Sequence, residues 1–215
     1  MDALARRALI ALLLCVAAIV VIERRLEMPA AAPTITQEVR SAGLRFSPTV
    51  PEADRAWVLA AVASARPEAR RLIDEIDGLV EVQTHVGGGT AIGWAEMDSS
   101  GAVVSVDTAA LNGDRALDRS VVVLHELGHV IDHLLVPDEL VRELDRGIPR
   151  DGTCTPGSEP TGPCTAIEER FADTFAKWAL RGAVSLAGSG YGVPAPASLE
   201  DWGAPLARLT AELDA

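Results

Sequence analysis

Residues able to do metal chemistry gather in one short stretch, HELGHVIDH at positions 125–133. Residues four apart lie on the same face of an α-helix, so His125 and His129 can each offer a ring nitrogen to one metal ion. Glu126 stands beside this pair and could take a proton from a water molecule that the metal activates. The H-E-x-x-H spacing therefore indicates hydrolase chemistry with zinc (Zn2+) as cofactor. The alternative is a buried helix whose histidines are hydrogen-bonded core residues.

An amphipathic pattern predicts that the helix carrying this motif lies in the core. Apolar residues recur at i, i+3, i+4 and i+7 on the face away from the histidines: Leu127, Val130, Ile131 and Leu134. We expect Asp118 to cap the helix at its N-terminus and Pro137 to follow its C-terminus. Gly128 costs about 1 kcal/mol relative to alanine inside a helix, so we expect another element to pack closely at that turn.

A second amphipathic helix is predicted for residues 165–178. One of its faces is aromatic and suited to the core: Phe171, Phe175 and Trp178. The other face carries acidic and small residues, which leave room for a neighbouring helix: Glu169, Ala172, Asp173 and Ala176.

Two adjacent glutamates of this second helix compete for a role as metal ligand. Thr165 followed by Glu168 has the spacing of a capping box, which leaves Glu169 free to reach a metal ion. Asp173, one turn further on, could accept a hydrogen bond from the far nitrogen of a ligand histidine and fix its tautomer. The alternative for both glutamates is a solvated first turn that the helix dipole favours.

Together the two segments resemble the gluzincin metallopeptidases, whose third zinc ligand is a glutamate on a later helix. The run HELGHVIDH followed by EERFADTFAKW is most similar to the small lethal-factor-like peptidase domains. This resemblance, which covers two helices, implies a set of site residues: zinc ligands His125, His129 and Glu169, general base Glu126, and supporting residue Asp173. It also implies a zincin-like α+β fold, in which a small antiparallel or mixed sheet packs on the active-site helix and on a second, glutamate-bearing helix.

The chain departs from that family at the residue that stabilises the oxyanion. Lethal-factor-like members place a tyrosine about two turns before the ligand glutamate, whereas this stretch is here a loop rich in Gly, Pro and Thr. Tyr191 and His85 are the candidate donors, and the sequence places neither of them. His133 also pairs with His129 at i, i+4, but the longer metzincin pattern is absent because residue 135 is Leu. We interpret His133 as structural or cleft-lining.

The amino-acid composition is typical of a globular domain, to which an N-terminal segment is added. The 215 residues are 48% hydrophobic and 4% aromatic, enough for one core. A net charge of -12 argues against nucleic acid and against an anionic membrane surface as partners. Nothing in the sequence indicates the oligomeric state.

Residues 1–27 predict a signal anchor or transmembrane segment, because Arg6 and Arg7 precede an unbroken apolar run over 8–22. That run spans about 22 Å as a helix, and flanking arginines could extend it toward the roughly 30 Å of a bilayer core. Pro33 is a poor first residue after the small residues before it, which favours an uncleaved anchor over secretion after signal cleavage. Residues 28–50 then form a predicted linker, and residues 51–215 the predicted metallopeptidase domain.

Cys154 and Cys164 lie in the loop between the two motif helices. A disulfide between them would close a short ring and contribute about 2 to 3 kcal/mol. We expect this bridge, and with it an extracytoplasmic compartment. The alternative is a pair of free thiols.

The remaining sequence predicts a small sheet with flanking helices. Expected elements are a strand at 44–46, one helix or two over 51–76, a strand at 79–86, a hairpin of 91–97 with 102–106, and helices at 139–145 and 199–213. By the gluzincin resemblance, Val103 to Val106 could bind an extended peptide by strand addition. An ordinary sheet edge is the alternative for that strand.

These patterns lead to the hypothesis of a membrane-anchored, extracytoplasmic zinc endopeptidase that acts on a peptide or protein substrate. Glu126 would take the proton of the activated water and pass it to the leaving amine. A rival hypothesis is a non-catalytic metal-binding protein of the cell envelope that retains the fold. A third is a peptidase facing the cytoplasm, for which Cys154 and Cys164 would be reduced.

Overall fold

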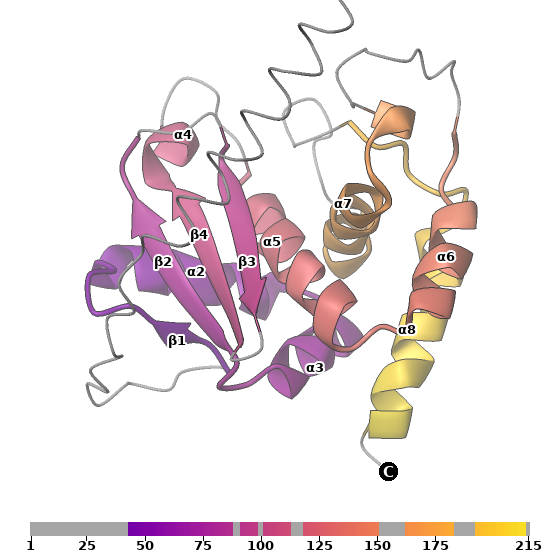
Figure 1. The fold of residues 1–215 in the computed structure, drawn as a ribbon, viewed down its shortest axis with the longest axis horizontal. Coiled ribbons are helices and arrows are strands. Elements are labelled where there is room, and N and C mark those ends of the chain that lie inside the picture. The colour runs from indigo at the N-terminus through magenta and orange to yellow at the C-terminus, as the bar shows by residue number, and fades with distance from the viewer. Residues whose placement is uncertain are drawn as a thin grey trace, which may run out of the picture. The chain divides into compact units, whose positions relative to one another are not determined.

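A four-stranded sheet lies beside a group of helices in the computed structural model, which describes residues 43–87, 91–98, 101–112, 118–150, 162–182 and 192–213 (Figure 1). All of these residues belong to one unit that begins at Glu38. The unit mixes helices with a small mixed sheet, so the α+β class predicted from the sequence is confirmed.

The sheet has the strand order β1-β2-β4-β3. Its strands are β1 (Arg45–Phe46), β2 (Val80–His85), β3 (Gly93–Asp98) and β4 (Gly101–Asp107). Strands β1, β2 and β4 run parallel, whereas β3 pairs antiparallel with β4 and completes the predicted hairpin.

The position of β4 corrects the prediction for Val103 to Val106. That stretch pairs with β2 on one side and with β3 on the other, so its backbone has no free edge. The cause is the tight hairpin, which places β3 on the outside of the sheet. Within the described residues, β3 pairs only with β4 and is therefore the edge strand on this side.

The N-terminal part of the unit supplies two helices, α2 (Glu52–Ser64) and α3 (Pro67–Glu75). Pro67 occupies the first turn of α3, and the extended residues before it separate the two helices. Three apolar residues from the stretch assigned to the linker are buried in the core because β1 joins the sheet there: Leu44, Phe46 and Val50.

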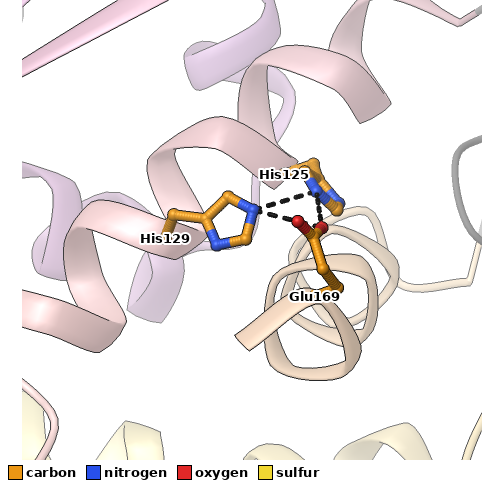
Figure 2. A group of neighbouring side chains, drawn as sticks. All are labelled: His125, His129 and Glu169. Atoms are coloured by element: carbon orange, nitrogen blue, oxygen red, sulfur yellow. Dashed lines mark hydrogen bonds and ion pairs between the residues drawn. The ribbon is translucent and has the colours of Figure 1, made fainter. Parts of the chain in front are cut away.

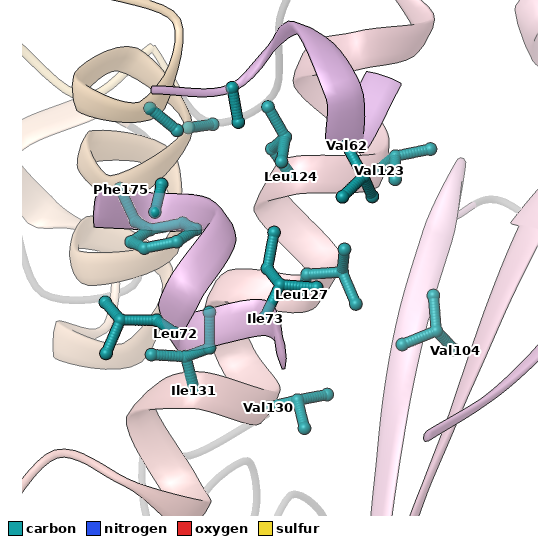
Figure 3. Close-up of a cluster of buried hydrophobic side chains, with 14 of the residues drawn as sticks. Val62, Leu72, Ile73, Val104, Val123, Leu124, Leu127, Val130, Ile131 and Phe175 are labelled. Atoms are coloured by element: carbon teal, nitrogen blue, oxygen red, sulfur yellow. The ribbon is translucent and has the colours of Figure 1, made fainter. Parts of the chain in front are cut away.

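The motif helix is α5 (Arg119–Leu134), which follows the short helix α4 (Thr108–Asn112). Asp118 caps α5 as predicted, since its carboxylate accepts hydrogen bonds from the backbone N–H groups of Ser120 at 2.9 Å and Val121 at 3.4 Å. Pro137 follows the helix and is the N-cap of α6 (Asp138–Arg146). Most of α5 is buried, and of the core residues labelled in Figure 3 it contributes Val123, Leu124, Leu127, Val130 and Ile131.

The second motif helix, α7 (Ile167–Ala179), follows a short 3-10 turn at Gly162–Cys164 and precedes α8 (Leu199–Leu213). Its aromatic face is fully buried, as predicted. The predicted capping box is wrong, because Ala166 is the N-cap and no side chain caps the helix. Thr165 is instead part of the preceding turn, where its N–H donates to the carbonyl of Gly162 at 3.3 Å.

Helix α5 lies between the sheet and α7 (Figure 1). At Gly128 a larger residue would have little space, because a Cβ atom would lie 3.1 Å from Cα of Ala172 and 3.3 Å from the ring of Phe175. The predicted close packing at this glycine is therefore confirmed, and the partner is α7.

Two predictions that concern the membrane and the cysteines need correction. Within the described residues, no helix is long and apolar enough to cross a membrane; the longest, α5, has 16 residues and carries charged side chains. The predicted transmembrane helix is thus not found there, and residues 1–27 lie outside the described residues. The predicted pairing of Cys154 with Cys164 is not seen either, because Cys154 lies outside the described residues; of Cys164 the structure shows only that it is disulfide-bonded.

Candidate metal centre

Three side chains from two helices converge on one point in the described structure. His125 and His129 project from α5, and Glu169 reaches toward them from α7 (Figure 2). Their ligand atoms all lie within 4.8 Å of one another. Nε2 of His125 lies 3.0 Å from Oε2 of Glu169 and 3.2 Å from Nε2 of His129, and Nε2 of His129 lies 3.3 Å from the same carboxylate oxygen. This group could bind a metal ion.

Local structure explains why these residues meet. The i, i+4 spacing on α5 places both imidazoles on one face. Gly128 lies between the histidines in sequence, and its lack of a side chain lets α7 approach at Ala172. Glu169 precedes Ala172 by three residues, so this close helix contact brings its carboxylate to the histidine pair.

The charges of this group favour an ionised carboxylate. Burial by itself raises the pKa of Glu169, but the hydrogen bonds with His125 and His129 outweigh it and lower the pKa to about 2. Burial lowers the pKa of His129, whereas the hydrogen bond and the charge of Glu169 raise it, and the net result is a raised pKa. Glu169 therefore presents a negative charge to the ring nitrogens at neutral pH.

Glu126 lies next to this group, against the edge strand. Its side chain is 5% exposed, and a Cβ atom on Gly93 of β3 would lie only 2.5 Å from its Oε1. Burial raises the pKa of Glu126, with the two histidines acting in the opposite direction and Glu169 in the same direction. The predicted base is thus a buried carboxylate within electrostatic reach of all three candidate ligands.

A pocket of about 300 Å3 opens beside the metal group, with His129 as part of its wall. Its lining combines apolar and charged residues: Met97, His129, Asp132, His133, Asp138, Val141, Arg142, Ile167 and Glu168. His133 lines this pocket, in agreement with one of its two predicted roles. Burial raises the pKa of Asp132 to about 6.

Asp173 has a different partner from the one predicted. Its carboxylate is buried and pairs with Nζ of Lys177 at 2.5 Å, rather than with a histidine of α5. Lys177 also donates a hydrogen bond to the carbonyl of Val193. The reason is the i, i+4 spacing of the two residues on α7, which favours a pair within the helix.

Of the two candidate oxyanion donors, the structure describes only His85, which does not lie at the metal group. His85 is the last residue of β2, and its ring centroid lies 4.7 Å from that of Trp94 on β3. Side chains alternate along a strand, so Trp94 points away from the face on which Gly93 meets Glu126. His85 therefore lies on the opposite face of the sheet. Tyr191 lies outside the described residues.

Sequence analysis missed a buried charge that holds α7 in place. Arg170, directly after Glu169, is 0% exposed; its Nε lies 2.6 Å from Oδ1 of Asp145, and its Nη2 donates to the carbonyl of Ile148 at 2.9 Å. A lone arginine between a candidate ligand and an aromatic core face was the available signal. The partner could not be identified from local spacing, because it lies on α6.

Comparison with known proteins adds no assignment. No protein-family model, curated protein or solved structure matches this chain. The side chains themselves form a group able to bind a metal ion next to a buried glutamate.

Proposed function

We propose that this protein is a zinc-dependent endopeptidase, with His125, His129 and Glu169 as metal ligands and Glu126 as general base. The observation that carries the proposal is the convergence of both motif histidines with a carboxylate from a separate helix. That convergence required a tertiary contact between α5 and α7, which a chance H-E-x-x-H sequence would have no reason to produce.

The ligand atoms lie close enough together for one zinc ion to bind all three. Tetrahedral zinc with ligand bonds of 2.0 to 2.1 Å holds its ligand atoms roughly 3.3 to 3.4 Å apart. The three separations in the group are 3.0, 3.2 and 3.3 Å. Two imidazoles and one carboxylate also match a common donor set of catalytic zinc sites, in which a fourth position stays open for water or substrate.

The reaction would divide between the metal and the protein. Zinc bound by these residues would supply Lewis-acid activation of the attacking water and of the scissile carbonyl. Glu126 would take the proton from the water and deliver it to the leaving amine. A raised pKa suits this role, because the same carboxyl group must accept a proton and then release it.

An extended peptide would bind along β3. This edge strand faces α5 with Gly93 at Glu126 and with Met97 at the pocket beside His129. A peptide added to the outer side of β3 would run past the metal group, with backbone hydrogen bonds providing affinity. The pocket of about 300 Å3 could hold one substrate side chain.

The test compares the full chain with its Glu126→Gln variant. Both proteins should bind one equivalent of zinc, whereas only the wild type should cleave peptides of a diverse library. Loss of the base should lower kcat by about 10²- to 10⁴-fold. Zinc content by elemental analysis separates a binding defect from a catalytic one.

A non-catalytic metal-binding protein is the second candidate function. It is favoured by one observation: His85 lies on the opposite face of the sheet, so the part of the chain that the structure describes offers neither predicted oxyanion donor at the metal group. Wild-type protein that holds zinc but matches Glu126→Gln in failing to cleave any library peptide would establish this candidate instead.

A further inference from the structure

We infer that Gly93 is a positioning residue that provides the space in which the carboxylate of Glu126 is held. A Cβ atom at this position would lie 2.5 Å from Oε1, 2.9 Å from Cδ and 3.0 Å from Cγ of Glu126. Non-bonded carbon and oxygen atoms do not approach this closely, so any side chain at residue 93 requires the glutamate to move. The catalytic part of this inference rests on the proposed function; the packing part does not.

Space, rather than backbone freedom, is what residue 93 needs from glycine. Gly93 does not belong to the described glycines with positive φ, so an L-residue could adopt its backbone conformation. It also lies within β3, where glycine normally weakens a strand and often marks close approach of another group. The approaching group here is the side chain of Glu126.

Hydrogen bonds anchor β3 at Gly93, so we expect Glu126 to move rather than the strand. Gly93 pairs with Val106 of β4, and the carbonyl of the preceding residue, Ile92, accepts a hydrogen bond from the N–H of Asp107 at 2.8 Å. The carboxylate of Asp107 in turn accepts hydrogen bonds from the N–H groups of Gly87 and Ala109. A methyl group at residue 93 would therefore displace the flexible carboxylate and not the anchored strand.

Displacement of this carboxylate would affect the base and leave the ligands in place. Glu126 is in contact with β3, whereas His125, His129 and Glu169 are held by the packing of α5 on α7 at Gly128. The two glycines thus have different neighbours: Gly93 faces the carboxylate of the base, and Gly128 faces the backbone of the helix that carries a ligand. This difference provides a matched comparison.

The first test measures packing and is independent of activity. Gly93→Ala should lower the melting temperature of the full chain in the wild-type background. In the Glu126→Ala background the clash is gone, so the same substitution should lower it much less or raise it. An equal decrease in both backgrounds would overturn the inference, whatever the protein's activity.

The second test measures catalysis together with metal content. Gly93→Ala should retain the zinc content of the wild type, lower kcat about 100-fold through misplacement of the base, and change KM little. Gly128→Ala should instead lower the zinc content. Glu75→Ala, an exposed position on α3, should match the wild type in kcat, zinc content and melting temperature.

The two tests distinguish failure of this inference from failure of the proposed function. If the wild type cleaves no peptide but the melting temperatures show the coupling, Gly93 still holds Glu126 in place and the proposed endopeptidase activity is wrong. If the wild type cleaves peptides and Gly93→Ala keeps full kcat, the inference is overturned while the proposed function stands.

Discussion

Glu169 and Arg170 are neighbours in sequence on α7, yet the half-buried carboxylate and the fully buried guanidinium meet opposite kinds of partner. Arg170 meets a carboxylate of opposite charge, Asp145, and backbone carbonyl oxygens. Glu169 meets the rings of His125 and His129, and in the described part of the chain it pairs with no lysine or arginine. Arg170 forms an ion pair within the protein. Glu169 instead belongs to a group of side chains that could bind a metal ion.

A second buried ion pair, Asp173 with Lys177, lies on the same helix. Asp173 and Lys177 are both buried and lie 2.5 Å apart. A buried charge is costly unless a partner compensates it, and in these two cases the fold supplies the partner. At the metal group it supplies two imidazoles and a carboxylate, so a bound cation would complete the charge balance. The difference separates the charges that hold the scaffold from the carboxylate that could serve as a metal ligand.

The largest effect on stability is expected from breaking the buried Arg170–Asp145 ion pair. Arg170→Met leaves Asp145 buried without its main partner and should destabilise the full chain by about 3 to 5 kcal/mol in chemical denaturation. Arg142→Met is the matched control, because Arg142 forms an exposed ion pair with Glu139 and should cost at most about 1 kcal/mol. Equal stability of the two variants would show that the buried pair does not hold α7 in place.

The next effect concerns the metal group itself. Zinc at about 100 times its Kd should stabilise the wild type by about 2.7 kcal/mol, a rise in Tm of roughly 5 to 11 °C for a chain of this size. Glu169→Ala should remove most of that rise, because a ligand is lost. Glu168→Ala changes the exposed neighbouring glutamate and should preserve it. A full zinc-dependent shift in Glu169→Ala would refute the assignment of this ligand.

Acid should weaken the Arg170–Asp145 ion pair in a predictable pH range. Burial raises the pKa of Asp145, but hydrogen bonds from Arg170 and Arg150 outweigh it and lower the pKa overall. The pair therefore contributes its full stability above the unfolded pKa of about 3.9, and loses it as pH falls through the lower folded value. Asp145→Asn should be less stable than the wild type at pH 7, and the gap in Tm should narrow below about pH 4. A gap that stays constant down to pH 3 would contradict this linkage.

The smallest expected effect is a rise in Tm rather than a fall, and it comes from a substitution of Asp132 in the pocket beside His129. Burial raises the pKa of Asp132 to about 6, so folding becomes less favourable as pH rises from about 4 to 6 and this carboxyl group ionises. Asp132→Asn should raise Tm modestly at pH 7 and have no such effect near pH 4. Thermal unfolding of both proteins across this range measures the difference. A lower Tm at pH 7 would show that the ionised carboxylate has a stabilising partner.

Sequence alone predicted those parts of the site that local spacing determines. The cap at Asp118, the close packing at Gly128 and the aromatic face of α7 follow from single helices and are confirmed. One contact between distant elements, that of Glu169 with His125 and His129, was expected from the family resemblance and is present. Other such contacts were missed or misjudged: the Arg170 pair with α6, the contact of Gly93 with Glu126, and the central place of β4. The capping box at Thr165 failed because a 3-10 turn competed for the same backbone groups.

The buried ion pair at Arg170 has a consequence for how a metal ion would be acquired. The Arg170–Asp145 pair anchors α7 on α6, and Glu169, the residue before Arg170, faces the two histidines (Figure 2). Small zinc domains that fold only around their metal must reorganise the backbone at each binding event. Here α7 is anchored by an ion pair that involves no metal, so stripping a bound ion with a chelator should be reversible on simple addition of zinc.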